Sequence, residues 1–322
     1  MEEQKNKIDE KETDEEIVYQ IFDKVFKKVI TLSAKAVVNL INGLFGTEYP
    51  LDSKISYNWT EFEDDRLRRI LADTILTING THSYHMEAQM EKDNAIVFRV
   101  FDYGFQHANR MRVMDAEAGT YVLRFPQPVV IYLYYEGIVP DIYTLTLEQN
   151  NGEIMCEYKV PVVKVQDISA EELSERKMIV LLPFHILKLR QLIKKKTIGE
   201  ALPELKRVIN DDIIGNINRN VELGNIELED AVKLKKYLIA LRQYLSRYHK
   251  ELEAMKDMTD ESFMTDVDIL CEKWHKRLDD KDKECQQKLD EKECQYQQEL
   301  DEKQNIIEKL QQEIEQLKLQ KA

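Results

Sequence analysis

The sequence predicts a mixed α/β domain that is followed by a helical region and a long C-terminal coiled coil. Three observations support this fold class. Apolar residues recur at helical spacing in residues 17–41, the spacing changes to strand-like alternation from Ile55, and charged residues crowd the two ends of the chain. Helical and strand-like segments alternate up to about residue 185, which is typical of a mixed α/β domain.

The first expected element is a helix that begins at Ile17, after an acidic tail. Residues 1–16 contain few residues that could enter a core, so we expect them to be disordered. Apolar residues continue at helical spacing to Ile41, and the helix ends at a stop signal at Gly43 or at Gly46.

Three antiparallel strands are expected next, because the segments that follow are rich in Ile, Thr, Tyr and Trp. These strands cover residues 55–62, 69–78 and 82–90. Asn79-Gly80 separates the second strand from the third, and this pair of residues is a strong signal for a hairpin turn.

A second helix and three further strands complete the predicted domain, which covers residues 17–185. The helix is expected from Asn94 to about Met114, with apolar residues on one side and a separate polar stripe that contains Arg99 and Tyr103. The strands are expected at residues 129–135, 142–148 and 154–165.

The rest of the chain is expected to be helical. Residues 186–258 contain two amphipathic stretches, 186–209 and 229–255, which predict a helical lobe. Residues 262–322 predict one long polar helix with a sparse apolar seam.

The apolar seam of the long helix indicates self-association. Leu278, Leu289 and Leu300 repeat every 11 residues, a period that favours a slightly right-handed supercoil, and the spacing becomes heptad-like between Ile307 and Leu317. A helix this polar cannot stabilise itself alone, so we expect a homo-oligomer through residues 275–320. The alternative is a solvated single helix.

The charge balance limits the possible partners. A formal net charge of −14 argues against tight nucleic-acid binding over the whole surface, because phosphate binding draws on Lys and Arg. A local basic run could still dock a phosphate backbone, or it could be a solvated helix face. This run consists of Lys188, Arg190, Lys194, Lys195 and Lys196.

Other classes of protein lack support in the sequence. The four cysteines are too few and too irregularly spaced for a disulfide framework or a zinc site, so we expect free thiols. No signal peptide or membrane-spanning run is visible, and we expect a cytoplasmic protein that does not bind membranes. Nucleotide-binding and acyl-transfer motifs are not found either.

Two carboxylates on neighbouring strands, Asp73 and Glu87, form a candidate metal site. Mg²⁺ prefers oxygen ligands and is often held by one or two carboxylates together with substrate phosphates. Asp73 lies in an apolar strand, where a carboxylate beside a second carboxylate is unfavourable without a cation. The alternative is that both are solvent-facing strand residues.

The site hypothesis places a condition on the hairpin. A two-residue turn would pair Ile78 with Thr81 and direct Asp73 and Glu87 to opposite faces of the sheet. A three-residue loop or a bulge would place Asp73 opposite Glu87 and bring His85 to the same face. We therefore predict a three-residue loop or a bulge. His85 itself is either a base or an ordinary strand histidine.

The order of these residues resembles the PD-(D/E)XK nuclease superfamily. The pattern has Asp23 and Phe26-Lys27 on a first helix, Asp73 on a strand, Glu87-Ala88-Gln89 on the next strand, and Arg99 and Tyr103 on a helix. More narrowly, the chain is similar to the recombination-promoting nuclease branch, also called putative transposases, which has the Glu-X-Gln variant. The resemblance covers about residues 17–185 and implies a restriction-endonuclease-like core.

The resemblance implies a role for each matching residue near the metal. Asp73 and Glu87 would be ligands of Mg²⁺ or Mn²⁺, with the backbone carbonyl of Ala88 as a third ligand. Gln89 stands where the superfamily has a lysine. An amide can orient groups by hydrogen bonding but supplies no positive charge, so the enzyme would rely more heavily on its metal.

The resemblance also implies roles for residues on the two helices. Asp23 would be an acidic residue near the site, or else a helix-surface carboxylate. Arg99 and Tyr103, four residues apart, would contact DNA phosphate together with Lys27. The alternative for Arg99 and Tyr103 is ordinary packing or a salt link.

The leading hypothesis from sequence is therefore a Mg²⁺-dependent DNA endonuclease whose cleavage promotes recombination. The alternative is a catalytically inactive protein with the same fold, which recruits partners through its coiled coil. Both carboxylates favour the enzyme, whereas the missing lysine and the acidic balance favour the interaction protein.

Overall fold

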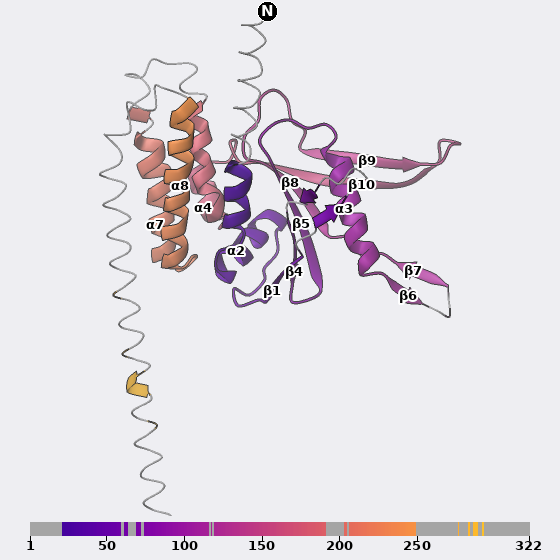
Figure 1. Ribbon diagram of the computed structural model, residues 1–322, viewed down its shortest axis with the longest axis horizontal. Coiled ribbons are helices and arrows are strands. Elements are labelled where there is room, and N and C mark those ends of the chain that lie inside the picture. Colours follow the sequence, from indigo (N-terminus) through magenta and orange to yellow (C-terminus); the bar gives the residue numbers. More distant parts are fainter. Residues whose placement is uncertain are drawn as a thin grey trace, which may run out of the picture. The chain divides into compact units, whose positions relative to one another are not determined.

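The fold is seen in a computed structural model (Figure 1). It describes residues 21–58, 61–63, 69–71, 74–115, 117, 119–190, 203–204, 206–248, 276, 283, 286–288 and 292. The chain divides into two compact units, Met1–Val267 and Asp268–Ala322, and the fold below belongs to the first. The predicted acidic tail lies outside the described residues. So does most of the predicted coiled coil, of which the few described positions are helical.

The centre of the first unit is a six-stranded mixed sheet with the order β1-β4-β5-β8-β10-β9. Its strands are β1 (Ile55–Asn58), β4 (Thr74–Ile78), β5 (His82–Gln89), β8 (Gln127–Tyr132), β9 (Ile142–Glu148) and β10 (Ile154–Lys164). The β5–β8 and β8–β10 pairs are parallel and the others antiparallel. The predicted mixed α/β class is confirmed.

Two of the predicted strands are each divided in the structure. The segment 55–62 contains all of β1 and the first two residues of β2 (Glu61–Glu63), and the segment 69–78 contains β3 (Arg69–Leu71) and β4. β2 and β3 pair with each other in a separate two-stranded sheet. The alternation of residues predicted the extended conformation correctly, but it could not indicate which sheet each part joins.

Helix α3 (Ile96–Arg110) connects the parallel strands β5 and β8 and covers one face of the sheet. Parallel neighbours require such a crossover. A tight turn reverses the chain direction and therefore joins only antiparallel strands, whereas the next parallel strand must start again at the same end of the sheet. The apolar side of α3 packs on a small core that includes Val100, Val130 and Val160. After α3, strands β6 (Val113–Asp115) and β7 (Thr120–Val122) form a hairpin that projects from the domain (Figure 1).

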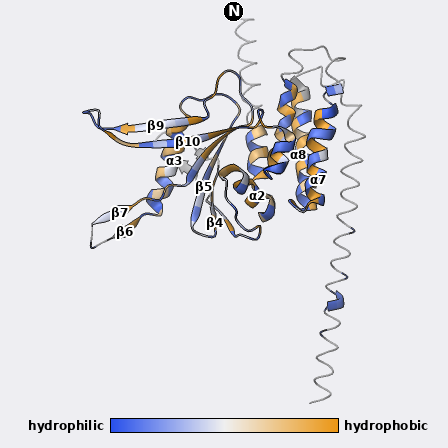
Figure 2. Cartoon of the chain, turned by 180° about the vertical axis from the view of Figure 1, so that it is seen from behind, coloured by the Kyte–Doolittle hydropathy of each residue, from blue (hydrophilic) through white to orange (hydrophobic). Residues whose placement is uncertain are grey.

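Residues on the opposite face of the sheet share one buried core with a group of helices. These helices are Ile21–Val29, α2 (Ala34–Phe45), α4 (Ala170–Glu175), the 3₁₀ helix η1 (Ile179–Leu187), the π-helical segment η2 (Val208–Gly215), α7 (Asn216–Glu222) and α8 (Leu228–Tyr248). In Figure 2, α7 and α8 carry both apolar and polar residues along their length, as amphipathic helices do. Their apolar sides face the core.

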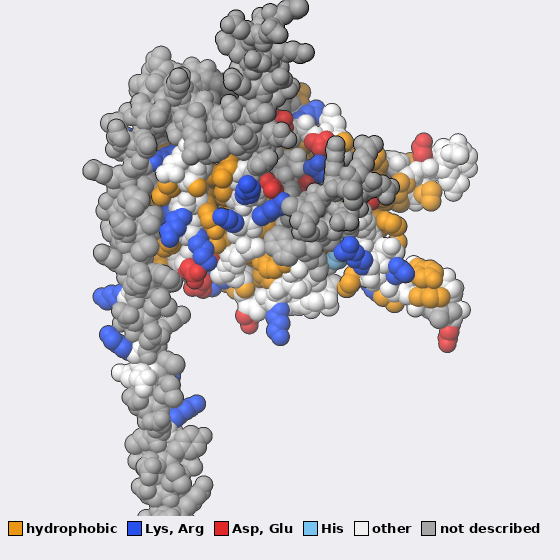
Figure 3. Space-filling view, viewed as in Figure 1, with side chains coloured by type: hydrophobic (Ala, Val, Ile, Leu, Met, Phe, Trp, Pro, Cys, Tyr) orange, Lys and Arg blue, Asp and Glu red, His pale blue; other side chains and the backbone are white. Residues whose placement is uncertain are grey.

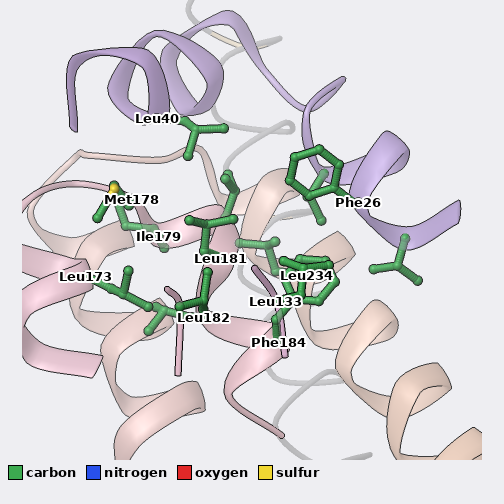
Figure 4. Packing of buried hydrophobic residues seen from close by; sticks show 14 of the residues in the cluster. Phe26, Leu40, Leu133, Leu173, Met178, Ile179, Leu181, Leu182, Phe184 and Leu234 are labelled. Carbon is green, nitrogen blue, oxygen red and sulfur yellow. The ribbon is translucent and has the colours of Figure 1, made fainter. Parts of the chain in front are cut away.

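This core is continuous across the boundary that we expected near residue 185. Phe26, Phe184 and Leu234 belong to one buried cluster, although they come from the first helix, η1 and α8 (Figure 4). Every residue of η1 is buried. The helices expected as a separate lobe therefore share their core with the α/β domain.

No single described helix is long and apolar enough to cross a membrane. The helices Ile21–Val29 and Ala34–Phe45 have the length and apolar composition of a membrane span only when taken together, and they are bent by 105° relative to each other. Their apolar side chains, such as Phe26 and Leu40, are buried in the protein core (Figure 4).

Asp230 ties the start of α2 to the start of α8. Its buried carboxylate accepts hydrogen bonds from the Ser33 backbone N–H at 2.9 Å, from the Ser33 hydroxyl, and from the Glu227 backbone N–H at 3.0 Å. The Ser33 hydroxyl oxygen in turn caps α2 by accepting from the Ala36 N–H. One carboxylate thus satisfies donors at the N-termini of two helices.

Replacing this carboxylate should destabilise the fold. We expect Asp230→Ala to lower the free energy of unfolding by about 3 kcal/mol, because buried donors lose a charged acceptor. The matched control is Glu229→Ala, which removes an exposed carboxylate paired with Lys233 and should cost at most about 1 kcal/mol. Urea unfolding measures both, and equal losses would contradict this role of Asp230.

His185 of η1 is a buried titratable group in the same core. The side chain is 1% exposed, and Nε2 lies 3.2 Å from the Val165 carbonyl oxygen, which places the proton on Nε2 in a neutral ring. Burial, with a smaller contribution from the charge of Lys188, lowers the pKa of His185 to about 3. The folded protein therefore keeps this ring neutral where an unfolded histidine would be protonated.

Acid should consequently destabilise the protein through His185. As the pH falls below 6.5, the pKa of histidine in the unfolded chain, His185 binds a proton in the unfolded state. In the folded state His185 stays neutral until the pH reaches about 3. Between about pH 7 and about pH 5, wild type should lose about 2 kcal/mol more stability than His185→Gln. Urea unfolding at the two pH values tests this, and the same loss in both proteins would contradict it.

Candidate active site

The hairpin between β4 and β5 has the three-residue loop that the site hypothesis requires. Ile78 pairs with His82, so that Asn79, Gly80 and Thr81 lie between the strands. Asn79 and Gly80 have φ values of 52° and 72°, and the Thr81 N–H donates to the Ile78 carbonyl at 3.1 Å. Both residue types tolerate positive φ, which explains why this pair forms the turn. The predicted extra residue is confirmed.

The pairing between β4 and β5 is described from Ile78 at the turn back to Thr74, the first residue of β4. Ile75 lies opposite His85 and Thr74 lies opposite Met86. Asp73 lies outside the described residues, so its pairing with Glu87 stays a prediction.

One face of β5 is covered by one side of α3. Three residues of α3, spaced four apart, each contact a residue at alternate positions of β5. The contacting pairs are Arg99 with Glu87, Tyr103 with His85, and His107 with Ser83. A step of four residues along α3 therefore matches a step of two residues along β5, and the three pairs form a polar row between the helix and the strand.

Glu87 is the charged centre of this row. It is 3% exposed, and its Oε1 accepts from Arg99 Nε at 2.9 Å and Nη2 at 2.7 Å, and from Gln89 Nε2 at 3.3 Å. Burial raises the pKa of Glu87, but the Arg99 guanidinium, which is positively charged and hydrogen-bonded to the carboxylate, opposes this effect, and the pKa lies below its usual value. The carboxylate is therefore ionised at neutral pH.

The second carboxylate oxygen of Glu87, Oε2, is buried. Within the described part of the chain, Oε2 has no hydrogen-bond partner, and His85 Nε2 lies 3.8 Å from it, beyond hydrogen-bond distance. A buried carboxylate oxygen without a partner is costly, whereas a divalent cation binds such an oxygen well. This atom fits a metal ligand, although the described residues, which exclude Asp73, contain no group of three or more His, Cys, Asp or Glu that could hold a metal.

A cavity of about 410 Å³ is lined by residues that follow Glu87 in the chain and by residues from other elements. Its lining includes Asp23, Ala88, Gln89, Glu91 and Asp93. The structure thus brings the predicted helical acid, Asp23, to the same place as two residues of the Glu-Ala-Gln motif. It also adds Glu91 and Asp93, which sequence reasoning missed even though both lie within three residues of the end of the predicted third strand.

The residues expected to contact DNA make contacts within the protein. Lys27 pairs with Asp23 at 2.9 Å, and Arg99 pairs with Glu87. Tyr103 is 3% exposed, with its ring 6.1 Å from that of His85. The expectation that Tyr103 offers its side chain to DNA disagrees with this burial, because the four-residue spacing that aligns it with Arg99 turns both toward β5.

The predicted basic run beyond η1 is described only in part. Lys188 donates to the Ile168 carbonyl at 3.1 Å, and the Arg190 guanidinium lies 4.8 Å from the centre of the Tyr134 ring. Lys194, Lys195 and Lys196 lie outside the described residues. The two described members are therefore engaged by the protein, and the role of the run in binding DNA stays a prediction.

Comparison of the chain with models of protein families, with curated proteins and with solved structures found no match. The case for a function therefore depends on the chemistry of the site. A buried anionic oxygen, a neighbouring guanidinium and a cavity whose lining includes both acidic residues and Lys92 are suited to binding a divalent cation together with an anionic substrate.

The Glu87–Arg99 pair can be tested as a buried ion pair. Arg99→Met should lower the free energy of unfolding by roughly 2–3 kcal/mol, because it leaves the Glu87 charge buried with less compensation. Adding Glu87→Gln should recover most of that loss. Urea unfolding of the double-mutant cycle measures the coupling, and strictly additive effects of the two substitutions would show that the pair does not interact.

Proposed function

We propose that the chain is a metal-dependent DNA endonuclease with a PD-(D/E)XK-like core, whose cleavage promotes recombination. The observation that carries the proposal is the ionised, buried carboxylate of Glu87, with one oxygen held by Arg99 and the other without a partner among the described residues. A carboxylate oxygen of this kind suits a cation that also binds phosphate.

The arrangement of the elements supports the proposal. The helix with Asp23, the antiparallel pair β4–β5 with Glu87, and the helix with Arg99 follow one another in the order that the nuclease resemblance requires. Asp23 lines the same cavity as Ala88 and Gln89. These residues come from distant parts of the sequence, so their convergence is a property of the fold and not of the motif alone.

The proposed metal ligands are Asp73, Glu87 and the backbone carbonyl of Ala88. When bound there, Mg²⁺ or Mn²⁺ would activate a water molecule and neutralise charge on the phosphate. Glu87 contributes a carboxylate that is ionised before the metal arrives, and Gln89 orients that carboxylate through its amide. Arg99 places a guanidinium near the position where the superfamily has its lysine, and can contact a phosphate oxygen.

The surface charge permits contact with DNA despite the acidic balance of the chain. Figure 3 shows Lys and Arg side chains gathered over one face of the described residues. A local basic face can dock a phosphate backbone while the rest of the surface stays acidic. We further propose that residues 275–320 join copies of the chain into a homo-oligomer, which would suit paired cuts in the two strands.

A second candidate function is a catalytically inactive interaction protein. The observation that favours it is the hairpin β6–β7, in which Met114 and Tyr121 lie opposite each other and are 54% and 57% exposed. Exposed apolar residues that lie close together are typical of surfaces that bind other proteins. In this case Arg99 would simply neutralise Glu87, and no metal would bind.

Cleavage of supercoiled plasmid distinguishes the two functions. Purified protein with Mg²⁺ or Mn²⁺ should nick the plasmid, and Asp73→Ala and Glu87→Ala should each reduce the rate by at least roughly 100-fold, since each removes a metal ligand. The matched control is Glu157→Ala, which removes an exposed carboxylate on β10 and should keep the wild-type rate. Absence of nicking, or nicking that the two site variants retain, would reject the enzyme and favour the interaction protein.

A further inference from the structure

We propose that Arg99 makes metal binding at Glu87 depend on bound DNA. The inference rests on the proposed function, because it concerns the same carboxylate. Arg99 acts here as a positioning residue that occupies Glu87 in the free protein and turns to phosphate when DNA arrives.

The contacts of Arg99 place it between the buried site and the surface. Its Nε and Nη2 both donate to Oε1 of Glu87, whereas Nη1 lies 3.6 Å from Oδ2 of Asp93, a residue of the cavity lining. The Arg99 side chain is 38% exposed, although Glu87 is almost fully buried. One end of the guanidinium therefore holds the carboxylate and the other end is within reach of a molecule that enters the cavity.

A cation at Oε2 of Glu87 and the guanidinium at Oε1 would share one carboxylate. Two positive groups at such short separation repel each other, and the partly buried site screens this repulsion less than water does. The free protein should therefore bind a divalent cation at least roughly tenfold more weakly than the same site without the guanidinium. Arg99 compensates the Glu87 charge at the expense of metal affinity.

A DNA phosphate would remove this obstacle. Guanidinium groups bind phosphate through paired hydrogen bonds, and the exposed end of Arg99 can do so without unfolding any element. The phosphate both neutralises Arg99 and offers oxygen ligands to the metal. Since binding linkage is reciprocal, DNA should tighten metal binding and the metal should tighten DNA binding by the same factor.

Gln89 is the residue that leaves the role of the positive charge to Arg99. A lysine at this position would hold a permanent positive charge beside the phosphate, whereas the Gln89 amide is neutral and only donates to Glu87. The positive charge is instead on Arg99, on a separate helix, where it can move between the carboxylate and the substrate. The metal site is then completed only when DNA is in place.

Mn²⁺ titration by calorimetry, with and without an uncleavable phosphorothioate DNA duplex, tests the coupling. For wild type, DNA should tighten Mn²⁺ binding by at least roughly tenfold. Arg99→Gln should bind Mn²⁺ without DNA at least roughly fivefold more tightly than wild type, and DNA should then add little. The matched control is Arg112→Gln, which removes an exposed arginine that donates hydrogen bonds to Asn109 and should behave as wild type.

The outcomes separate this inference from the proposed function. Mn²⁺ binding that requires Glu87 but is equally tight in wild type and Arg99→Gln would overturn the coupling and leave the nuclease proposal standing. No Mn²⁺ binding by any of these proteins, with or without DNA, would overturn both. If Arg99→Gln fails to fold in a thermal unfolding control, Arg99→Lys replaces it. Because lysine keeps the charge, it should bind Mn²⁺ weakly without DNA, and tight binding would overturn the inference.

Discussion

The buried charge of Glu87 is the constraint on which the local structure depends. A carboxylate between a sheet and a helix is stable only if a cation or hydrogen-bond donors compensate it. Arg99 supplies that compensation from α3, which in turn must cross the sheet in the position that joins the parallel strands β5 and β8. The position of α3 is therefore determined both by the connection between β5 and β8 and by the need to place Arg99 beside Glu87.

The other side of the sheet provides the rigidity that such a site needs. The apolar segment η1 is buried on all sides by the first helices and by α8, and Asp230 links α2 to α8 by hydrogen bonds (Figure 4). The helix that carries Asp23 is part of this core, so the part of the cavity wall that contains Asp23 is fixed by packing. Side chains that must meet a metal or a phosphate are best held by elements of this kind.

Sequence patterns predicted much of the fold where one local rule decided the outcome. The strand at 142–148 and the position of the hairpin turn were predicted correctly, because alternation and the Asn-Gly pair act locally. The third residue of the hairpin loop was predicted from the site hypothesis and not from a local rule. The uniformly apolar η1 has no period to interpret, and the hairpin β6–β7 lies in a segment that we assigned partly to α3. Tertiary packing decided these two cases.

The candidate site was predictable in its residues but not in their contacts. Glu87, Gln89 and Asp23 were identified from their order along the chain, and the structure places Asp23 and Gln89 on one cavity. That Arg99 would bind Glu87 and that Tyr103 would be buried depends on how α3 is set on β5. A sequence shows which face of a helix is polar, but not whether that face meets solvent or a strand.

The most direct measurement is a crystal structure of the protein with Mn²⁺ and an uncleavable DNA duplex, with the metal located by anomalous scattering. We expect a Mn²⁺ peak about 2.2 Å from a Glu87 carboxylate oxygen, shared with Asp73, and the Arg99 guanidinium on a DNA phosphate. A complex in which no Mn²⁺ lies at Glu87 and Arg99 still holds its carboxylate would contradict the account.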